Sequence, residues 1–255
     1  MIKFTENDLF LVTGASSGIG KSIVLKINKL GGKVIGVARN RERLDSIKNL
    51  LTHPANYYTE VKNLTEDMGN LDKWVMEISI KYGKLKGLVL SAGNQQILPM
   101  NALDLEQAKE IFDINYFCNI MLAKGFCDRR INIGEGSSII FISSVASITG
   151  NAGIINYSAS KGAINSAVRS MAIEVAKQKI RVNSILPGLV KTELFEKWKE
   201  FYTKEYIEQM NKKYPLGIGS PEYISDMCCF LISENAKWIT GQCFVVDGGI
   251  SLTVG

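Results

Sequence analysis

The residues LFLVTGASSGIG, from Leu9 to Gly20, carry the strongest indication of the fold. Its first four residues are all apolar, which is typical of a strand buried on both faces, and a glycine-rich turn follows directly. Ile19 then starts a helical pattern of apolar positions that continues at Ile23 and Ile27. A buried strand, a glycine turn and a helix in this order predict the first βα unit of a parallel sheet.

The turn TGASSGIG, Thr13 to Gly20, has the spacing of a phosphate-binding loop. Glycine lets the chain turn tightly, lets backbone N–H groups approach a pyrophosphate, and lets the helix start against the strand. The helix N-terminus adds free N–H groups and the positive end of the helix dipole. A plain strand-to-helix turn with convenient glycines is the alternative. We expect the turn to bind a dinucleotide through Gly14, Ser16, Ser17, Gly18, Ile19 and Gly20.

The rest of the chain repeats this alternation. Short apolar runs are predicted as strands at Leu9–Thr13, Lys33–Val37, Leu88–Leu90, Ser138–Ile142, Arg181–Leu186 and Phe244–Val246, with Asn56–Glu60 as a weaker candidate. Helical spacing of apolar residues fills the intervals at Ile19–Leu30, Leu71–Tyr82 and Ala163–Val175. We therefore predict an α/β fold, a single Rossmann-type doubly wound parallel sheet of about seven strands with helices on both faces.

Length and composition bear on domain organisation. The 255 residues are 46% hydrophobic and 22% charged, which excludes disordered and fibrous classes and fits one globular α/β unit. No repeat or Pro/Gly/Ser linker marks a boundary, so we expect one dinucleotide-binding catalytic domain over residues 1–255. Residues 188–220 do not continue the alternation of strands and helices and are predicted as a substrate lid, with a nucleic-acid surface as the alternative. Its aromatic residues are Phe195, Trp198, Phe201, Tyr202, Tyr206 and Tyr214.

Charge, hydropathy and cysteine content bear on partners and location. The net charge of +5 is scattered without runs of like charge, so we expect no nucleic-acid partner. No window approaches eighteen uninterrupted apolar residues, and the N-terminus is polar, so we expect neither a membrane span nor a secretory leader. Five cysteines without a CxxC pair indicate reduced thiols in the cytoplasm, and adjacent Cys228 and Cys229 are predicted in the core rather than as a redox pair. The single histidine, His53, leaves no triad and no histidine metal cluster, so no metal is expected.

The end of the second predicted strand bears on the choice of dinucleotide. An acid usually stands about 20 residues after the glycine turn, where it binds the ribose 2′-hydroxyl. The strand VIGVARNR instead offers Ala38 and Arg39, followed by Arg41. An arginine can form a charge-assisted hydrogen bond with a 2′-phosphate. The alternative is that Arg39 is an ordinary solvent-exposed residue at the start of a helix. We expect NADP(H), with NAD less favoured.

A second motif, YSASK, places Tyr157 and Lys161 on one helix face. Ser144 follows the strand IIFIS, where the carboxyl end of a strand meets the crevice that holds ligands. An adjacent ammonium favours the phenolate, so we expect Lys161 to lower the pKa of Tyr157 and make it a usable acid or base. Ser144 is placed to stabilise charge on a substrate oxygen as hydride moves. A Tyr–Lys pair alone is weak evidence for a catalytic site. Its combination with Ser144 and the glycine turn indicates a catalytic group.

With these motifs the sequence resembles the short-chain dehydrogenase/reductase family over essentially its whole length. TGASSGIG resembles the family's cofactor turn, and Ser144, Tyr157 and Lys161 stand where its catalytic residues stand. FDINYF places Asn115 at a catalytic asparagine that bends a helix and holds a water in a proton relay. The ending PEYISDMCCFLISENAKWITGQ resembles that of 3-oxoacyl carrier-protein reductases. The resemblance implies hydride transfer between NADP(H) and a carbonyl/alcohol pair, with the proton passing through Tyr157.

The resemblance also implies cofactor contacts outside the glycine turn. Pro187 and Gly188 in LPGLVKT resemble the turn beneath the nicotinamide, with Thr192 in position to bond its carboxamide. The implied set is Arg39, Asn63, Leu64, Ser91, Ala92, Gly93, Tyr157, Lys161, Pro187, Gly188, Val190 and Thr192.

Three positions depart from the family pattern. Ser91 replaces an asparagine near the nicotinamide ribose, Asn63 replaces an aspartate beside the adenine, and Ser17 replaces a basic residue of many NADP-dependent members. The preference for NADP therefore depends mainly on Arg39.

Assembly and substrate are implied only in outline. The family is usually a homotetramer, with a homodimer as the alternative, and its long catalytic helix packs against a partner. Small or flexible side chains on this helix allow close contact but also suit packing on the sheet: Ala159, Ala163, Ala167 and Met171. The substrate is a 3-oxoacyl thioester, a sugar or another small ketone, contacted near Gln95, Ile154 and Phe195. Two alternative functions are less favoured. A non-catalytic dinucleotide sensor would not need Ser144, Tyr157, Lys161 and Asn115 together. A sugar-nucleotide-modifying relative usually has a longer substrate domain than this chain offers.

Overall fold

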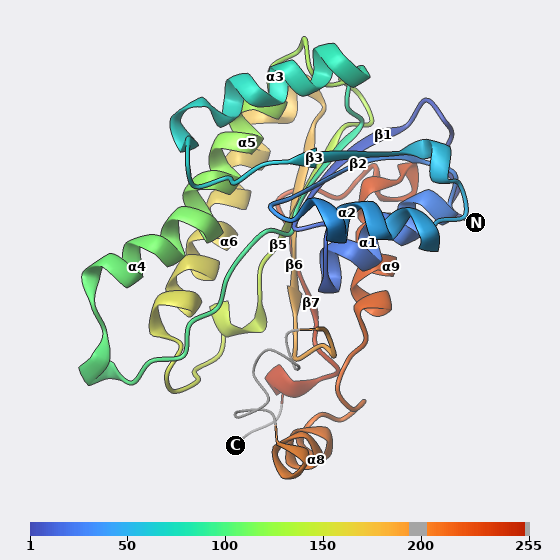
Figure 1. Ribbon diagram of the computed structural model, residues 1–255. Coiled ribbons are helices and arrows are strands. Elements are labelled where there is room, and N and C mark those ends of the chain that lie inside the picture. Colours follow the sequence, from blue (N-terminus) through green and yellow to red (C-terminus); the bar gives the residue numbers. More distant parts are fainter. Residues whose placement is uncertain (194–202, 253–255) are drawn as a thin grey trace.

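The computed structural model describes residues 1–193 and 203–252, and one parallel sheet runs through this part of the chain (Figure 1). Its order is β3-β2-β1-β4-β5-β6-β7, so the chain winds outward from β1 to one edge, returns, and winds from β4 to the other. The strands are β1 Leu9–Thr13, β2 Lys33–Ala38, β3 Tyr57–Val61, β4 Gly87–Leu90, β5 Ser138–Ile142, β6 Arg181–Pro187 and β7 Cys243–Val246. The predicted doubly wound parallel sheet is confirmed.

Helices cover both faces of the sheet, as Figure 1 shows with the sheet between them. One side carries α1 Gly18–Lys29, α2 Arg41–Ser46 and α9 Pro221–Ile232. The other side carries α3 Leu71–Tyr82, α4 Leu105–Phe112, α5 Cys118–Phe126 and α6 Ile155–Val175. A further helix, α8 Lys204–Lys213, lies away from the sheet beyond the lower ends of β6 and β7. The carboxyl ends of the strands thus face α8.

The core consists of two apolar layers separated by the sheet. Within β1, Leu9 and Leu11 belong to the layer beneath α3, α5 and α6, whereas Phe10 and Val12 belong to the layer beneath α1 and α9. This alternation follows from the twofold period of a strand, and it explains why the strand is apolar at every position. Cys228 and Cys229, together with other residues of α9, are buried in the second layer, which confirms their prediction as core.

The predicted strands all occur, with ends within one residue of those expected. The weakest candidate is β3, which begins at Tyr57 because Asn56 ends a short 3-10 turn, Pro54–Asn56. The predicted helical intervals did not include α4 or α5, and the bend expected at Asn115 is a π-helical turn, Asp113–Phe117, that joins these two helices.

The predicted lid is described only in part. Thr203 caps α8 by accepting a hydrogen bond from the Tyr206 N–H at 3.2 Å. The Tyr214 hydroxyl oxygen accepts a hydrogen bond from the Leu189 N–H at 2.8 Å. Phe195, Trp198, Phe201 and Tyr202 lie outside the described residues. Within residues 1–193 and 203–252, no helix has the length and apolar character needed to cross a membrane.

Candidate active site

The glycine turn between β1 and α1 has a shape that side chains would block. Gly14 has φ +66°, and a Cβ there would lie 2.9 Å from the backbone of Ser91 and Ala92 after β4. A Cβ on Gly20 would collide with the Gly14 carbonyl oxygen. Ser17, the residue before α1, makes no side-chain capping bond, so the start of α1 presents backbone donors rather than a cap. This cradle suits a phosphate group.

One donor of this cradle already has a partner within the chain. The Gly18 N–H donates to Glu193 Oε2 at 2.7 Å, and Lys21 Nζ lies 3.5 Å from the other carboxylate oxygen. Glu193 therefore places a carboxylate at the N-terminus of α1, the position predicted for a pyrophosphate. Glu193 was not among the predicted site residues, because a contact between residues 175 positions apart leaves no local pattern in the sequence.

The turn that follows β6 lies beside this cradle. Gly188 donates its N–H to the Val246 carbonyl at 3.1 Å, and a Cβ at Gly188 would lie 2.9 Å from Asp247 Cα. Farther along, the Thr192 methyl carbon lies 3.2 Å from the point where Gly18 would carry a Cβ. The structure thus brings Thr192, predicted near the nicotinamide, to the glycine turn.

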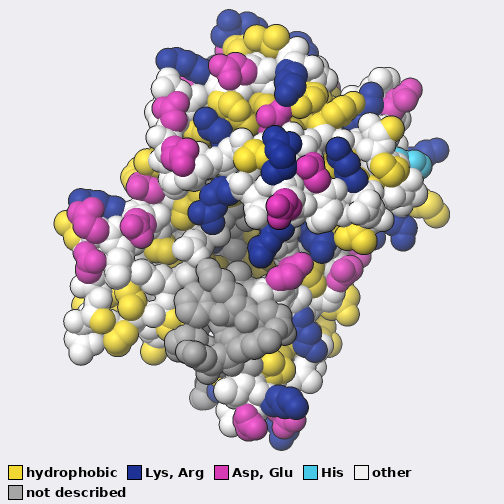
Figure 2. Space-filling model, viewed as in Figure 1, with side chains coloured by type: hydrophobic (Ala, Val, Ile, Leu, Met, Phe, Trp, Pro, Cys, Tyr) yellow, Lys and Arg dark blue, Asp and Glu magenta, His cyan; other side chains and the backbone are white. Residues whose placement is uncertain are grey.

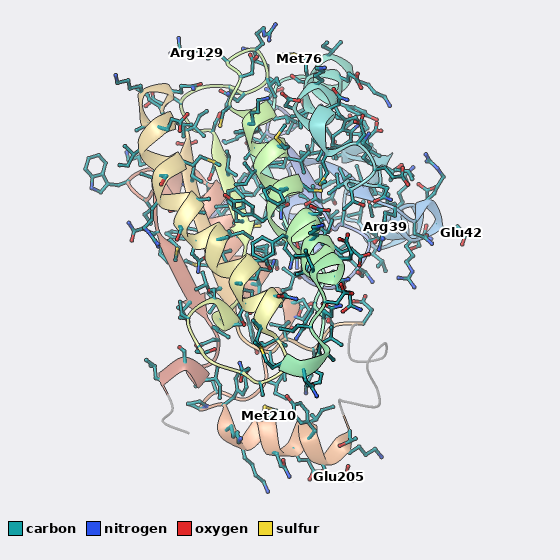
Figure 3. All side chains as sticks on the ribbon, turned by 90° about the vertical axis from the view of Figure 1, so that its left-hand side faces the viewer. Arg39, Glu42, Met76, Arg129, Glu205 and Met210 are labelled. Atoms are coloured by element: carbon teal, nitrogen blue, oxygen red, sulfur yellow. The ribbon has the colours of Figure 1, made fainter. Side chains whose placement is uncertain are left out.

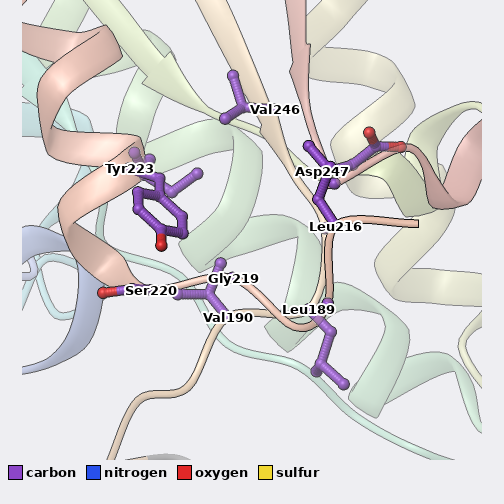
Figure 4. A pocket seen from close by; sticks show the side chains of 12 residues that line it. Leu189, Val190, Leu216, Gly219, Ser220, Tyr223, Val246 and Asp247 are labelled. Atoms are coloured by element: carbon purple, nitrogen blue, oxygen red, sulfur yellow. The ribbon is translucent and has the colours of Figure 1, made fainter. Parts of the chain in front are cut away.

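A cavity of about 330 Å³ lies on the α9 side of the same turn (Figure 4). Tyr223 of α9 faces Val190 and Gly219 across it, and Leu216 and Asp247 line another wall. Most of the lining is apolar. Ser144, Tyr157, Lys161 and Asn115 are not among its lining residues, so this cavity is separate from the predicted catalytic group.

Arg39 lies at the surface immediately after β2, near Glu42 at the start of α2 (Figure 3). The N-cap of α2 is Asn40, whose side chain accepts from the Arg43 N–H at 2.8 Å. Arg39 makes no ion pair with any residue in the described ranges. The helix start therefore has its own cap, and the Arg39 guanidinium stays available to an anion.

Two loops, one after β4 and one after β3, hold other predicted cofactor contacts. The Thr13 hydroxyl accepts from the Ser91 and Ala92 N–H groups at 3.1 Å each, so the turn after β4 is held without a side chain at Ser91. After β3, the Asn63 side chain bonds within its own turn, donating to Glu66 at 2.9 Å. The Leu64 side chain is buried in the core. An adenine contact at Leu64 would therefore involve its backbone.

Ser144, Tyr157 and Lys161 come together at the carboxyl end of β5. Ser144 follows this strand and caps the short turn Val145–Ser147, while Tyr157 lies in the first turn of α6 and hydrogen-bonds Ser144. Lys161 is 5% exposed; its Nζ donates to the Ile142 carbonyl at 2.8 Å and lies 5.8 Å from the centre of the Tyr157 ring.

The pKa values differ from the prediction. We expected Lys161 to lower the pKa of Tyr157; instead burial raises the pKa of Tyr157, opposed by the hydrogen bond with Ser144. Burial also lowers the pKa of Lys161 to about 8, because both charged forms lose contact with water. The expectation was wrong because removal of the Tyr157 phenol from water raises its pKa by more than the hydrogen bond with Ser144 lowers it.

Asn115 lies in the π-helical turn and is fully buried. Its Nδ2 donates to the Asn94 carbonyl at 2.9 Å and to Ser160 Oγ at 3.0 Å, and its Oδ1 accepts from the Asn94 N–H at 2.8 Å. The expected bend is thus a π turn. Gly93 makes room for this arrangement, since a Cβ there would lie 2.8 Å from Asn115 Oδ1 and 3.3 Å from Lys161 Nζ.

Basic and acidic side chains are interspersed on the face shown in Figure 2. Such mixing does not form the continuous basic stripe that a nucleic-acid surface needs.

Comparison with known proteins agrees with this geometry. Residues 14–251 match a family described as enoyl-(acyl carrier protein) reductase. The 3-oxoacyl-[acyl-carrier-protein] reductase FabG of Rickettsia prowazekii is 38% identical over 94% of this chain and 95% of its own. A tropinone reductase homologue of Arabidopsis thaliana is 32% identical over 95% and 91%. A short-chain type dehydrogenase/reductase of Mycobacterium ulcerans superposes with a TM-score of 0.88 at 29% identity, covering 98% of this chain and 92% of its own.

Proposed function

The chain belongs to the short-chain dehydrogenase/reductase family, and we propose that it reduces the ketone of a 3-oxoacyl thioester with NADPH. The family makes it an oxidoreductase that uses a nicotinamide dinucleotide and acts on the CH–OH/carbonyl pair of a small molecule. The observation that carries the proposal is the grouping of Ser144, Tyr157 and Lys161 at the carboxyl end of β5. The relatives of named activity support the thioester as substrate.

The residues present fit a dinucleotide. Gly14 and Gly20 leave space that a Cβ would fill, and the start of α1 offers backbone donors for the pyrophosphate. Thr192 lies beside this cradle, and Gly188 stands at the start of the same segment; both are proposed to hold the nicotinamide end. When bound, the reduced nicotinamide supplies the hydride for the carbonyl carbon.

The chain's own residues handle the carbonyl oxygen. In the proposed mechanism the Ser144 hydroxyl donates to that oxygen, and Tyr157 Oη delivers its proton to it as negative charge develops. The raised pKa of Tyr157 keeps the phenol protonated at neutral pH, which suits the reducing direction. Lys161, with a pKa near 8, is proposed to help replace the proton on Tyr157 and to bind the cofactor ribose. Asn115 is proposed as the end of the proton path.

We propose NADP rather than NAD as the cofactor because a positively charged residue follows β2. Arg39 is exposed, and α2 does not use it as a cap. A guanidinium there favours a 2′-phosphate by a charge-assisted hydrogen bond, whereas the 2′-hydroxyl of NAD lacks the usual carboxylate partner.

We also propose a homotetramer or homodimer, and a single catalytic domain with its lid at 188–220. The alanine face of α6 is not buried against the sheet: Ala159 is exposed, and Ala163 and Ala167 are half-buried. Small side chains on an open face allow a partner helix to approach closely. Light scattering of the purified protein measures the assembly. The five free cysteines support a reducing compartment such as the cytoplasm.

The test is a screen for oxidation of NADPH and NADH against an acetoacetyl thioester, a bicyclic ketone and reducing sugars. We expect the thioester to be turned over best, and Tyr157→Phe to lose nearly all turnover while binding NADPH as well as the wild type does. Full activity of Tyr157→Phe would overturn the acid assignment. Micromolar NADPH binding without turnover of any ketone would favour a dinucleotide sensor, and preference for another ketone would reassign the substrate.

A further inference from the structure

Asn119 lies one helical turn after Asn115, at the start of α5, and is 1% exposed. Its Nδ2 donates to the Asn115 carbonyl at 2.7 Å and lies 3.5 Å from the Ile114 carbonyl. Both carbonyls belong to the π turn Asp113–Phe117. The Asn119 amide is therefore attached to the turn that presents Asn115 to the site.

Packing does not explain an asparagine at this position. Its Oδ1 is buried and has no hydrogen-bond partner within the described ranges. A buried acceptor without a partner destabilises the folded state, and an apolar side chain of similar size would avoid this loss. Its neighbours Cys118 and Leu122 on α5 are fully buried and apolar. The donor half of the amide is thus the part with an identifiable function.

From this turn a line of hydrogen bonds reaches the predicted acid. Asn115 Nδ2 donates to Ser160 Oγ at 3.0 Å, and Ser160 Oγ donates to the Tyr157 carbonyl at 2.8 Å. Ser160 is fully buried in α6. Asn119, Asn115 and Ser160 therefore connect α5 to the first turn of α6, which carries Tyr157.

We propose that Asn119 is a positioning residue for the proton transfer: its amide donor holds the π turn open and thereby fixes Asn115, Ser160 and Tyr157. The inference rests on the proposed function. π turns are rare and occur mostly where they present a functional group, since a regular α-helical turn is otherwise favoured. Loss of the donor lets the turn relax, and the Asn115 amide then loses its alignment with Asn94 and Ser160.

The experiment compares Asn119→Val with Asn119→Thr. The two side chains have nearly the same shape, but only threonine has a hydroxyl that can donate to the carbonyl four residues earlier. With the ketone that the wild type reduces, we expect kcat of Asn119→Val to fall about ten- to a hundredfold, as for a misplaced catalytic group. KM for NADPH should stay within about twofold, and the pH at which kcat changes with Tyr157 ionisation should move. Asn119→Thr should recover most of kcat and the wild-type pH profile.

Asn132 provides a matched control. It is also a buried asparagine, and its Nδ2 donates to the Asp128 carbonyl four residues earlier at 3.0 Å. Among the described residues, no hydrogen bond joins Asn132 to Ser160. We expect Asn132→Val to lower thermal stability while leaving the pH profile of kcat unchanged. Equal kcat values and pH profiles for Asn119→Val and Asn119→Thr would overturn the proposal.

Hydrogen exchange over residues 113–119 and 155–160 adds a readout that needs no substrate. We expect faster exchange in Asn119→Val than in Asn119→Thr. If the wild type reduces no ketone but the two variants still differ in exchange, the proposed function fails and the positioning of the turn stands. If the wild type is active and the variants agree in both readouts, the positioning role fails alone.

Discussion

Glu193→Gln is expected to tighten the binding of NADPH, because the native carboxylate occupies part of the position proposed for the pyrophosphate. Glu193 Oε2 accepts from the Gly18 N–H at 2.7 Å, at the N-terminus of α1. An incoming phosphate needs the same donor and is repelled by the negative charge beside it. Glutamine keeps the size and an acceptor oxygen of the native side chain but removes the charge.

The size of the effect follows from this single contact. A hydrogen bond to a charged group contributes about 1.5–3 kcal/mol, against about 0.5–1.5 kcal/mol for a neutral one. The Glu193 side chain is 55% exposed, so solvent screening reduces the difference to roughly 0.5–1 kcal/mol. Converted to affinity, this predicts a Kd for NADPH about two- to fivefold lower than that of the wild type.

The assay is a fluorescence titration of NADPH at low and high ionic strength, with the larger gain expected at low salt. Glu135→Gln is the matched control, since Glu135 is an exposed carboxylate that pairs with Lys179. An unchanged or higher Kd for Glu193→Gln would show that the native carboxylate does not compete with the pyrophosphate. An equal gain in Glu135→Gln would assign the effect to net charge instead.

Three further perturbations test other parts of the site. Arg39→Ala should weaken NADPH by about tenfold or more relative to NADH, and an unchanged ratio of their Kd values would reopen the cofactor choice. Gly20→Ala should abolish NADPH binding in a titration, because its Cβ meets the Gly14 carbonyl oxygen; retained binding would contradict the described turn. Burial lowers the pKa of Lys161 from 10.5 to about 8, so the unfolded chain holds more protons in that window and this group makes stability rise with pH there. Lys161→Met should flatten that rise by about 3 kcal/mol in urea unfolding across the window, and parallel curves for the two proteins would contradict the burial argument.

The sheet was predictable because most of its strands are buried on both faces and are therefore apolar throughout. β1 and β5 match their predicted bounds for this reason. β3 was the weakest prediction because it is an edge strand with only Tyr57 fully buried, and its remaining residues need not be apolar. A run of apolar residues therefore indicates a buried strand, and this indication is weaker for strands that are partly exposed.

The site was predictable where its residues lie in local motifs. Tyr157 and Lys161 are one helical turn apart, so their proximity follows from the sequence alone. The partners of Asn115 and the contact of Glu193 depend on how distant segments pack, which no local pattern encodes. The pKa of Tyr157 was predicted in the wrong direction because burial is a property of the folded chain.

The segment from Gly188 to Glu193 touches the glycine turn at two points, through the Thr192 methyl group and the Glu193 carboxylate. A dinucleotide that enters the cradle must therefore rearrange the first residues of the chain that leads to α8. Such a connection predicts a compulsory order of arrival, with NADPH first and the ketone second. In steady-state kinetics, NADP⁺ would then compete with NADPH but not with the ketone, and the alcohol product would compete with neither.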